Sequence, residues 1–143
     1  MTFRWCARTR ALSLVLCLAS SVAMADVVAV VSSKSAITTL SKSQVSDIFF
    51  GKIASLPNGV QLVPIDQVEG TAARDEFYLK VAGKSPAQVK AYWSKIIFTG
   101  RGQPPQEVRD SVEVKKRIVG NVAAIGYIDL DMVDSSVRVL LTQ

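Results

Sequence analysis

A glycine, a threonine and an arginine at the start of an expected helix are the residues of this chain best suited to hold an anion. Gly70 and Thr71 open a helical pattern over residues 71–82, and Arg74 lies in its first turn. A helix start carries unpaired N–H groups and the positive end of the dipole, and a preceding glycine lets an anion approach them. The threonine hydroxyl and the arginine add further donors. This pattern indicates binding of phosphate or another oxyanion.

Ordinary helix capping explains the same residues without a ligand. Thr71 would cap the helix, and Asp75 would complement its dipole. Arg74 would then be a solvated side chain. The spacing alone favours this explanation, because many helices begin in this way. Glu69, immediately before the glycine, would also repel an anion.

Two serines are candidates for extra donors at the same site. A valine-rich run over residues 26–32 predicts a strand buried on both faces, and Ser32 and Ser33 stand at its end. Ligands of α/β proteins collect at the carboxyl ends of strands, where these hydroxyls would lie. Plain loop polarity is the simpler explanation of both serines.

Strands that alternate with helices are expected to position these residues. Ser41 with Gln44 predicts one capping box, and Ser85 with Gln88 predicts another. The patterns predict helices that begin near residues 41, 71, 85 and 110, and strands over 26–32, 60–65, 123–128 and 137–141. This order predicts an α/β fold with a central, mostly parallel sheet flanked by helices on both faces.

The first 25 residues have the pattern of a cleaved secretory signal peptide. A start with three arginines is followed by a short apolar run that ends in Ala23-Met24-Ala25. A membrane anchor is the alternative, but the run is short for a span. The prediction is therefore a periplasmic protein without membrane insertion after cleavage, in which residues 26–143 form one domain.

Cleavage would change both the charge and the cysteine content. The segment holds three of the 17 Lys and Arg residues and none of the 12 acids, so the remaining net charge would be +2. Such a balance does not indicate a nucleic-acid surface. Cys6 and Cys17 would both be lost, and the chain has no histidine. Triads based on histidine, cysteine nucleophiles and most zinc sites are thereby excluded.

Other motifs of catalysis or cofactor binding do not stand out. The chain has no P-loop, dinucleotide fingerprint or nucleophile elbow, so we expect neither a cofactor nor an enzyme. Asp129, Asp131 and Asp134 lie close together, but the glycine and distal glutamate of a calcium loop are missing. A polar loop between strands is the preferred interpretation of these acids.

Several short motifs together resemble those of periplasmic phosphate-binding proteins, the receptors of phosphate ABC transporters. That family has an Ile-Phe-x-Gly-Lys-Ile helix end, a turn with glycine, an apolar strand, Ser-Gly-Thr and a later Gly-Ala-Ile-Gly-Tyr segment. The matching stretches here are "IFFGKI" (48–53), Asn58-Gly59, Gly70-Thr71 with Phe77, and "NVAAIGYI" (121–128). The resemblance covers residues 26–143 and implies one lobe of a type II periplasmic binding protein, in a short single-lobe form.

The chain departs from the family at two ligand positions. The serine before Gly-Thr is replaced by Glu69, and the arginine four residues upstream of that serine is replaced by Ile65. The resemblance implies phosphate or another oxyanion as ligand and an ABC transporter permease as partner. The departures support an alternative, a protein-interaction or regulatory module that lost the anion site and associates with a partner or with itself.

Overall fold

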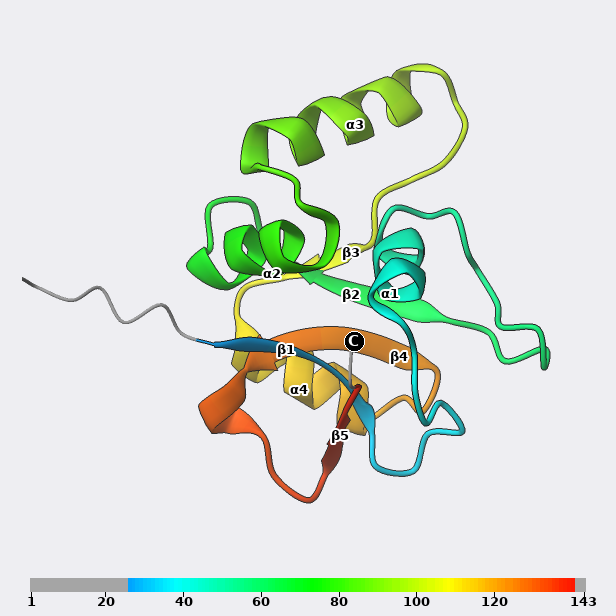
Figure 1. Cartoon of the computed structure of the whole chain (residues 1–143), viewed down its shortest axis with the longest axis vertical. Helices are drawn as coiled ribbons and strands as arrows, with labels where there is room; N and C mark the ends of the chain where they lie inside the picture. Colours follow the sequence, from blue (N-terminus) through cyan, green and yellow to red (C-terminus); the bar gives the residue numbers. More distant parts are fainter. Residues whose placement is uncertain (1–25, 141–143) are drawn as a thin grey trace, which may run out of the picture.

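The computed structural model describes residues 26–140, so the predicted signal segment lies outside the described residues. The strands are β1 (Val27–Ser32), β2 (Val63–Gln67), β3 (Gln106–Val108), β4 (Ala124–Asp129) and β5 (Val137–Val139). The helices are α1 (Lys42–Phe49), α2 (Ala72–Ala82), α3 (Pro86–Phe98) and α4 (Ser111–Val119), with a 3₁₀ turn η1 (Leu130–Met132) (Figure 1).

The five strands form one sheet in the order β3-β2-β4-β1-β5. β2 pairs in parallel with β3 and β4, whereas β1 pairs antiparallel with β4 and β5. Four strands therefore run in one direction and β1 runs against them, which confirms the expected mostly parallel α/β sheet. As a consequence, the carboxyl ends of β1 and β2 lie at opposite ends of the strands.

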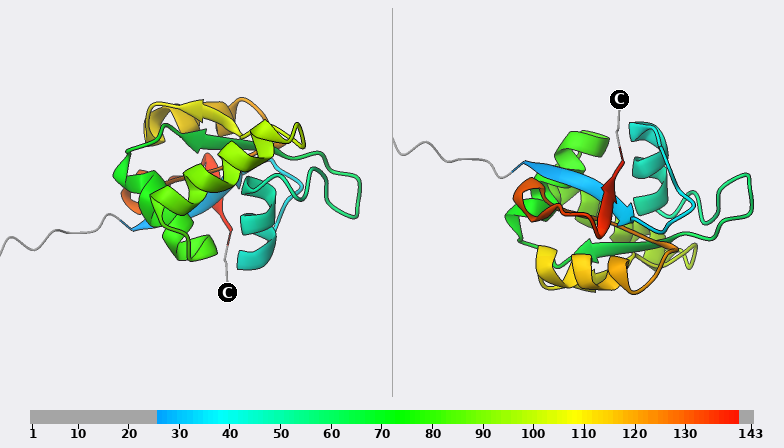
Figure 2. Two further views of the ribbon diagram at one scale, coloured as in Figure 1. Left: turned by 90° about the horizontal axis from the view of Figure 1, so that it is seen from above. Right: turned by 90° about the horizontal axis from the view of Figure 1, so that it is seen from below.

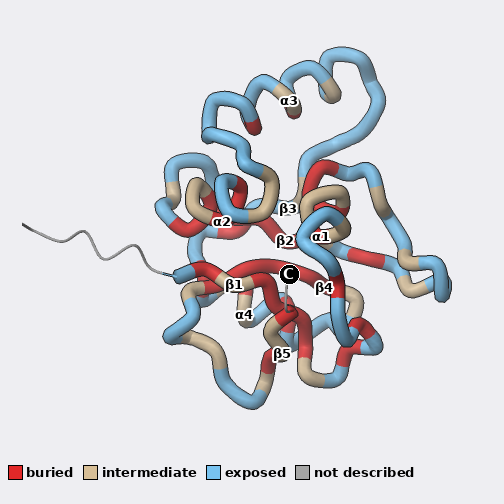
Figure 3. The backbone as a smooth tube through the Cα atoms, viewed as in Figure 1, coloured by how far each residue is buried: buried red, intermediate tan, exposed pale blue. Residues whose placement is uncertain are grey.

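Helices cover both faces of this sheet (Figure 2). Alternation along β1 sends Val30 toward α4 and Val31 toward α1 and α2, which gives one apolar cluster on each face. The strands at the centre are buried, whereas most of α3 is exposed (Figure 3). α3 packs on α2 and stands apart from the sheet (Figure 1).

Local sequence signals account for the helix boundaries. Both predicted capping boxes form, at Ser41 and at Ser85. Gly83 ends α2 in the left-handed conformation, with φ of 63°.

Two details of the strand pattern differ from expectation. β2 begins at Val63 rather than at residue 60, because Leu56 and Val60 are joined by a backbone hydrogen bond of a hairpin-like turn. The short strand β3 and the turn η1 were not predicted. β3 has only three residues, of which only Val108 is buried. It is therefore too short to show the alternation of apolar and polar residues that predicts a strand.

Gly126 is the position where β4 approaches α4 most closely. A Cβ atom there would lie 2.6 Å from Val114 Cγ1 and 3.0 Å from Ile118 Cδ1. We therefore expect Gly126→Ala to destabilise the protein by about 1–3 kcal/mol through overpacking, measured by urea unfolding. Gly102→Ala is the control, because its Cβ would meet no atom closer than 3.5 Å. Equal stability of the two variants would contradict the close packing.

Candidate functional site

The start of α2 forms an open shelf beyond the carboxyl end of β2, here called the α2 shelf (residues 70–73). Gly70 has φ of 94°, and a Cβ atom there would meet nothing within 4 Å. The first backbone bond of the helix runs from the Asp75 N–H to the Thr71 carbonyl, at 3.2 Å. The N–H groups of residues 72 and 73 therefore precede the intrahelical ladder and remain available to an acceptor.

Thr71 acts as the cap of α2. Its hydroxyl accepts a hydrogen bond from the Arg74 N–H at 3.4 Å and donates one to the Val68 carbonyl at 3.1 Å. The single hydroxyl hydrogen is therefore in use. An anion on the shelf would receive it only if the bond to Val68 were exchanged.

The guanidinium of Arg74 is not solvated but held against the ends of β2 and β3. Its side chain is only 10% exposed. Nη1 donates to the Gln67 carbonyl at 2.9 Å and to Glu107 Oε1 at 2.7 Å. Nη2 lies 3.9 Å from Asp66 Oδ2, and the group sits over the ring of Tyr78, 5.7 Å from its centroid.

The register of β2 and β3 explains why an arginine is needed here. Asp66 and Glu107 are direct partners on these parallel strands, so their carboxylates stand side by side. Like charges in such a position are destabilising. Arg74 lies between them and offsets both. Burial acts to lower the pKa of Arg74, but Asp66 and Glu107 together raise it above its ordinary value, so the charge is kept.

Asp66 is the buried centre of this group of side chains and is 1% exposed. Oδ2 accepts from the Tyr78 hydroxyl at 2.7 Å, and Oδ1 accepts from the Tyr127 hydroxyl and from the Gln67 N–H. Burial raises the pKa of Asp66, although Arg74 and both tyrosines oppose this shift. Burial and the neighbouring carboxylate raise the pKa of each tyrosine as well, so both remain donors.

Glu69, the residue expected to repel an anion, has a partner of its own. Its Oε1 lies 3.2 Å from Nζ of Lys90 on α3, and both side chains are more than half exposed. The crevice between this pair and Arg74 has a volume of about 10 Å³, too small for a phosphate. An anion on the α2 shelf must therefore lie on its outer, open side.

The two serines do not join this site. Ser32 is buried, and its hydroxyl accepts from the Lys34 N–H at 3.2 Å. The Ser33 carbonyl accepts from Arg138 Nη2 at 2.9 Å. Because β1 is antiparallel to β2, both serines and Gly70 lie at opposite ends of the strands. They supply no donors to the α2 shelf, which corrects their expected placement.

Sequence reasoning missed the polar group behind the shelf, made of Asp66, Tyr78, Tyr127 and Glu107. Two signals point to it. An acid directly follows Ile65, the buried apolar residue of β2, and Tyr127 stands within a buried stretch of β4. A buried tyrosine hydroxyl requires a partner, and an acid at a neighbouring strand end is a suitable one.

Within residues 26–140, no three His, Cys, Asp or Glu side chains are grouped so as to hold a metal ion, and Asp129, Asp131 and Asp134 form no such group. In the same range, no helix combines the length and apolarity that crossing a membrane requires.

The described residues form an α/β domain around a mostly parallel sheet of five strands. No family model matches the chain, and no curated protein matches it in sequence. A structure with bound phosphate, assigned to a phosphate ABC transporter substrate-binding protein of Clostridium perfringens, matches with a TM-score of 0.65 and 23% identity, over 81% of this chain and 44% of that one.

Two further solved structures agree. An ABC-type phosphate transport receptor of Vibrio cholerae matches with a TM-score of 0.63 and 18% identity, over 81% of this chain and 45% of that one. PstS of Borrelia burgdorferi matches with a TM-score of 0.58 and 16% identity, over 82% of this chain and 47% of that one. The chain thus has the fold of phosphate ABC transporter substrate-binding proteins, which confirms the resemblance seen in its motifs. It spans less than half the length of each of these proteins.

The hydroxyl of Tyr78 offers a test of the buried carboxylate. Tyr78→Phe removes a donor from Asp66, so we expect a loss of about 1–3 kcal/mol in the free energy of unfolding. The missing bond stabilises the ionised carboxyl, so the loss should be full above the raised pKa of Asp66 and shrink as the pH falls through that pKa, which lies above the ordinary Asp value of 3.8. Urea unfolding at several pH values measures this difference.

Tyr92→Phe is the matched control for this measurement. Its hydroxyl donates at 2.7 Å to the uncharged Phe50 carbonyl. The loss in this variant should therefore not follow the titration of a carboxyl group. A pH-independent loss in Tyr78→Phe would contradict the arrangement described for Asp66.

Proposed function

We propose that this protein is a non-catalytic periplasmic binding module of the phosphate-receptor kind, which holds phosphate or a related oxyanion on the outer side of the α2 shelf. One observation carries the proposal: Gly70 leaves open space in front of the free N–H groups that begin α2. The solved structure with bound phosphate shares this fold, which supports the same class of ligand. An ABC transporter permease is the partner proposed with it.

The charges around the shelf limit the affinity that this site can reach. Glu69 is paired with Lys90, which reduces its repulsion of an anion. Arg74 is shared between Asp66 and Glu107, so little of its charge is left for a ligand. We therefore expect a dissociation constant on the order of 1 mM, well above that of a site with free cations.

Calorimetric titration with phosphate and sulfate tests the proposal. Thr71→Ala should weaken binding about fivefold, because loss of the cap, worth ~1 kcal/mol, loosens the helix start whose N–H groups hold the anion. Ser85→Ala is the matched control, because it removes the cap of α3 at a comparable cost in stability without touching the shelf. Absence of heat at millimolar anion would contradict the proposal, as would equal weakening by the two substitutions.

The charge on Glu69 provides an independent arm of the same titration. Glu69→Ser should strengthen binding, because it removes a carboxylate beside the shelf and releases Lys90. Asp134→Ser is the control, since it removes one exposed carboxylate that is paired with Lys115 of α4 rather than with a residue near the shelf. If both variants bind equally well, net charge rather than the shelf governs the interaction.

A second function of a different class has its own support. Phe98 is 92% exposed and Ile97 is 55% exposed at the end of α3. Exposed apolar side chains on a projecting helix suit contact with another protein surface. The alternative proposal is therefore a ligand-independent interaction module that associates with a second copy of itself.

Size-exclusion chromatography with crosslinking distinguishes this alternative. A concentration-dependent dimer that is lost in Phe98→Ser would support it. Val122→Ser is the control, because Val122 is also exposed, at 52%, but lies before β4 rather than on α3. A monomer at all concentrations, or a dimer that both substitutions disrupt equally, would contradict it.

A further inference from the structure

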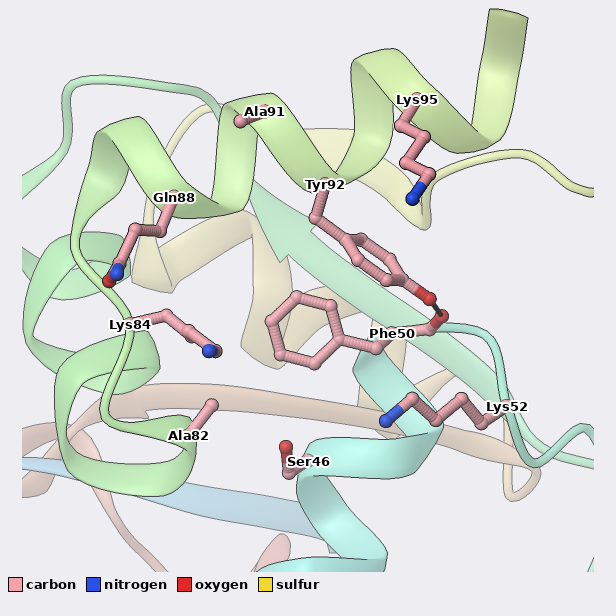
Figure 4. Close-up of a pocket in the computed structure, with 9 residues that line it drawn as sticks. All are labelled: Ser46, Phe50, Lys52, Ala82, Lys84, Gln88, Ala91, Tyr92 and Lys95. Atoms are coloured by element: carbon pink, nitrogen blue, oxygen red, sulfur yellow. Dashed lines mark hydrogen bonds between the residues drawn. The ribbon is translucent and has the colours of Figure 1, made fainter. Parts of the chain in front are cut away.

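A cavity at the carboxyl end of α2 has the size and charge of a second binding site. It lies between α1, α2 and α3 and has a volume of about 630 Å³ (Figure 4). Ligand pockets of proteins commonly occupy ~300–1,000 Å³. We call it the basic cavity, after the three lysines that line it, Lys52, Lys84 and Lys95.

The ends of three helices bring these lysines together. Lys52 follows the end of α1, and Lys84 follows Gly83, which ends α2 in the left-handed conformation. Lys95 lies three residues after Tyr92 on one face of α3, whereas Trp93 faces the core. Figure 4 shows the amino groups of Lys52 and Lys84 turned toward the space between the helices.

Two aromatic rings supply an apolar wall. Phe50 and Tyr92 pack edge to face, with ring centroids 4.8 Å apart. The Tyr92 hydroxyl donates to the Phe50 carbonyl at 2.7 Å, which fixes its ring and uses its donor. The wall therefore offers apolar carbon atoms to a ligand rather than a hydroxyl group.

The positive charge of the basic cavity is largely uncompensated. No Asp or Glu lines it. Lys52 lies 3.4 Å from Asp47, whereas Lys84 and Lys95 form no ion pair with any residue of the described range 26–140. Lysines near helix ends also complement the helix dipoles. The interaction with the dipole acts at each helix end separately. It does not explain why three lysines surround one cavity with an aromatic wall.

We infer that the basic cavity binds a small organic anion, in which one carboxylate or phosphate group is attached to an apolar body. The anionic group would lie among Lys52, Lys84 and Lys95, and the apolar body would lie against Phe50 and Tyr92. The α2 shelf, by contrast, offers N–H groups and no apolar wall.

Backbone amide NMR of the purified protein tests this inference, with benzoate, phenyl phosphate, inorganic phosphate and benzyl alcohol as probes. Benzoate or phenyl phosphate should shift the amide signals of residues 46–52 and 82–95, and the stronger of the two identifies the anionic group. The double variant Lys84→Gln, Lys95→Gln should weaken that binding about tenfold. Thr71→Ala should leave it unchanged, so this result is independent of the shelf.

A matched double variant controls for net charge. Lys34→Gln with Lys116→Gln removes the same charge from exposed positions elsewhere and should leave the affinity unchanged. The inference is overturned if neither organic anion shifts these signals, or if both double variants weaken binding equally. It is also overturned if benzyl alcohol or inorganic phosphate binds there as tightly as the organic anions.

Discussion

The buried carboxylate of Asp66 joins four elements at one edge of the sheet. It is the last residue but one of β2, accepts from Tyr78 of α2 and Tyr127 of β4, and reaches Glu107 of β3 through Arg74. A buried charge is tolerated only where donors and an opposite charge surround it. These residues must therefore keep their positions together. The orientation of α2, and with it the α2 shelf, follows from this requirement.

The same requirement sets the chemistry that the shelf retains. A single guanidinium serves two carboxylates that the strand register places side by side. An oxyanion that recruited Arg74 would leave Glu107 and the buried Asp66 without their counter-charge. The backbone N–H groups before the helical ladder can accept an anion without this cost, because no carboxylate depends on them for its hydrogen bonds. The anion proposed for this position would thus be held by backbone groups, whereas Arg74 balances the two carboxylates.

Local signals predicted most of the elements, whereas pairing between distant segments could not be foreseen. The caps at Ser41 and Ser85 and the glycine after α2 mark helices within a few residues of sequence. The direction of β1 depends on its pairing with β4, about a hundred residues later, and this placed Ser32 away from the shelf. The use of Arg74 depends equally on the register of β2 with β3, which no local pattern reveals.

The two ends of α2 offer different surroundings to an anion, and they are far enough apart to act separately. At its start the helix presents N–H groups, whereas its end presents carbonyl groups, so a site there must draw its positive charge from lysines. α2 has 11 residues, which at 1.5 Å per residue makes it about 16 Å long. The Debye length at physiological salt is ~8 Å, so charges at one end are largely screened from the other. The charges around the shelf therefore place no electrostatic constraint on the basic cavity.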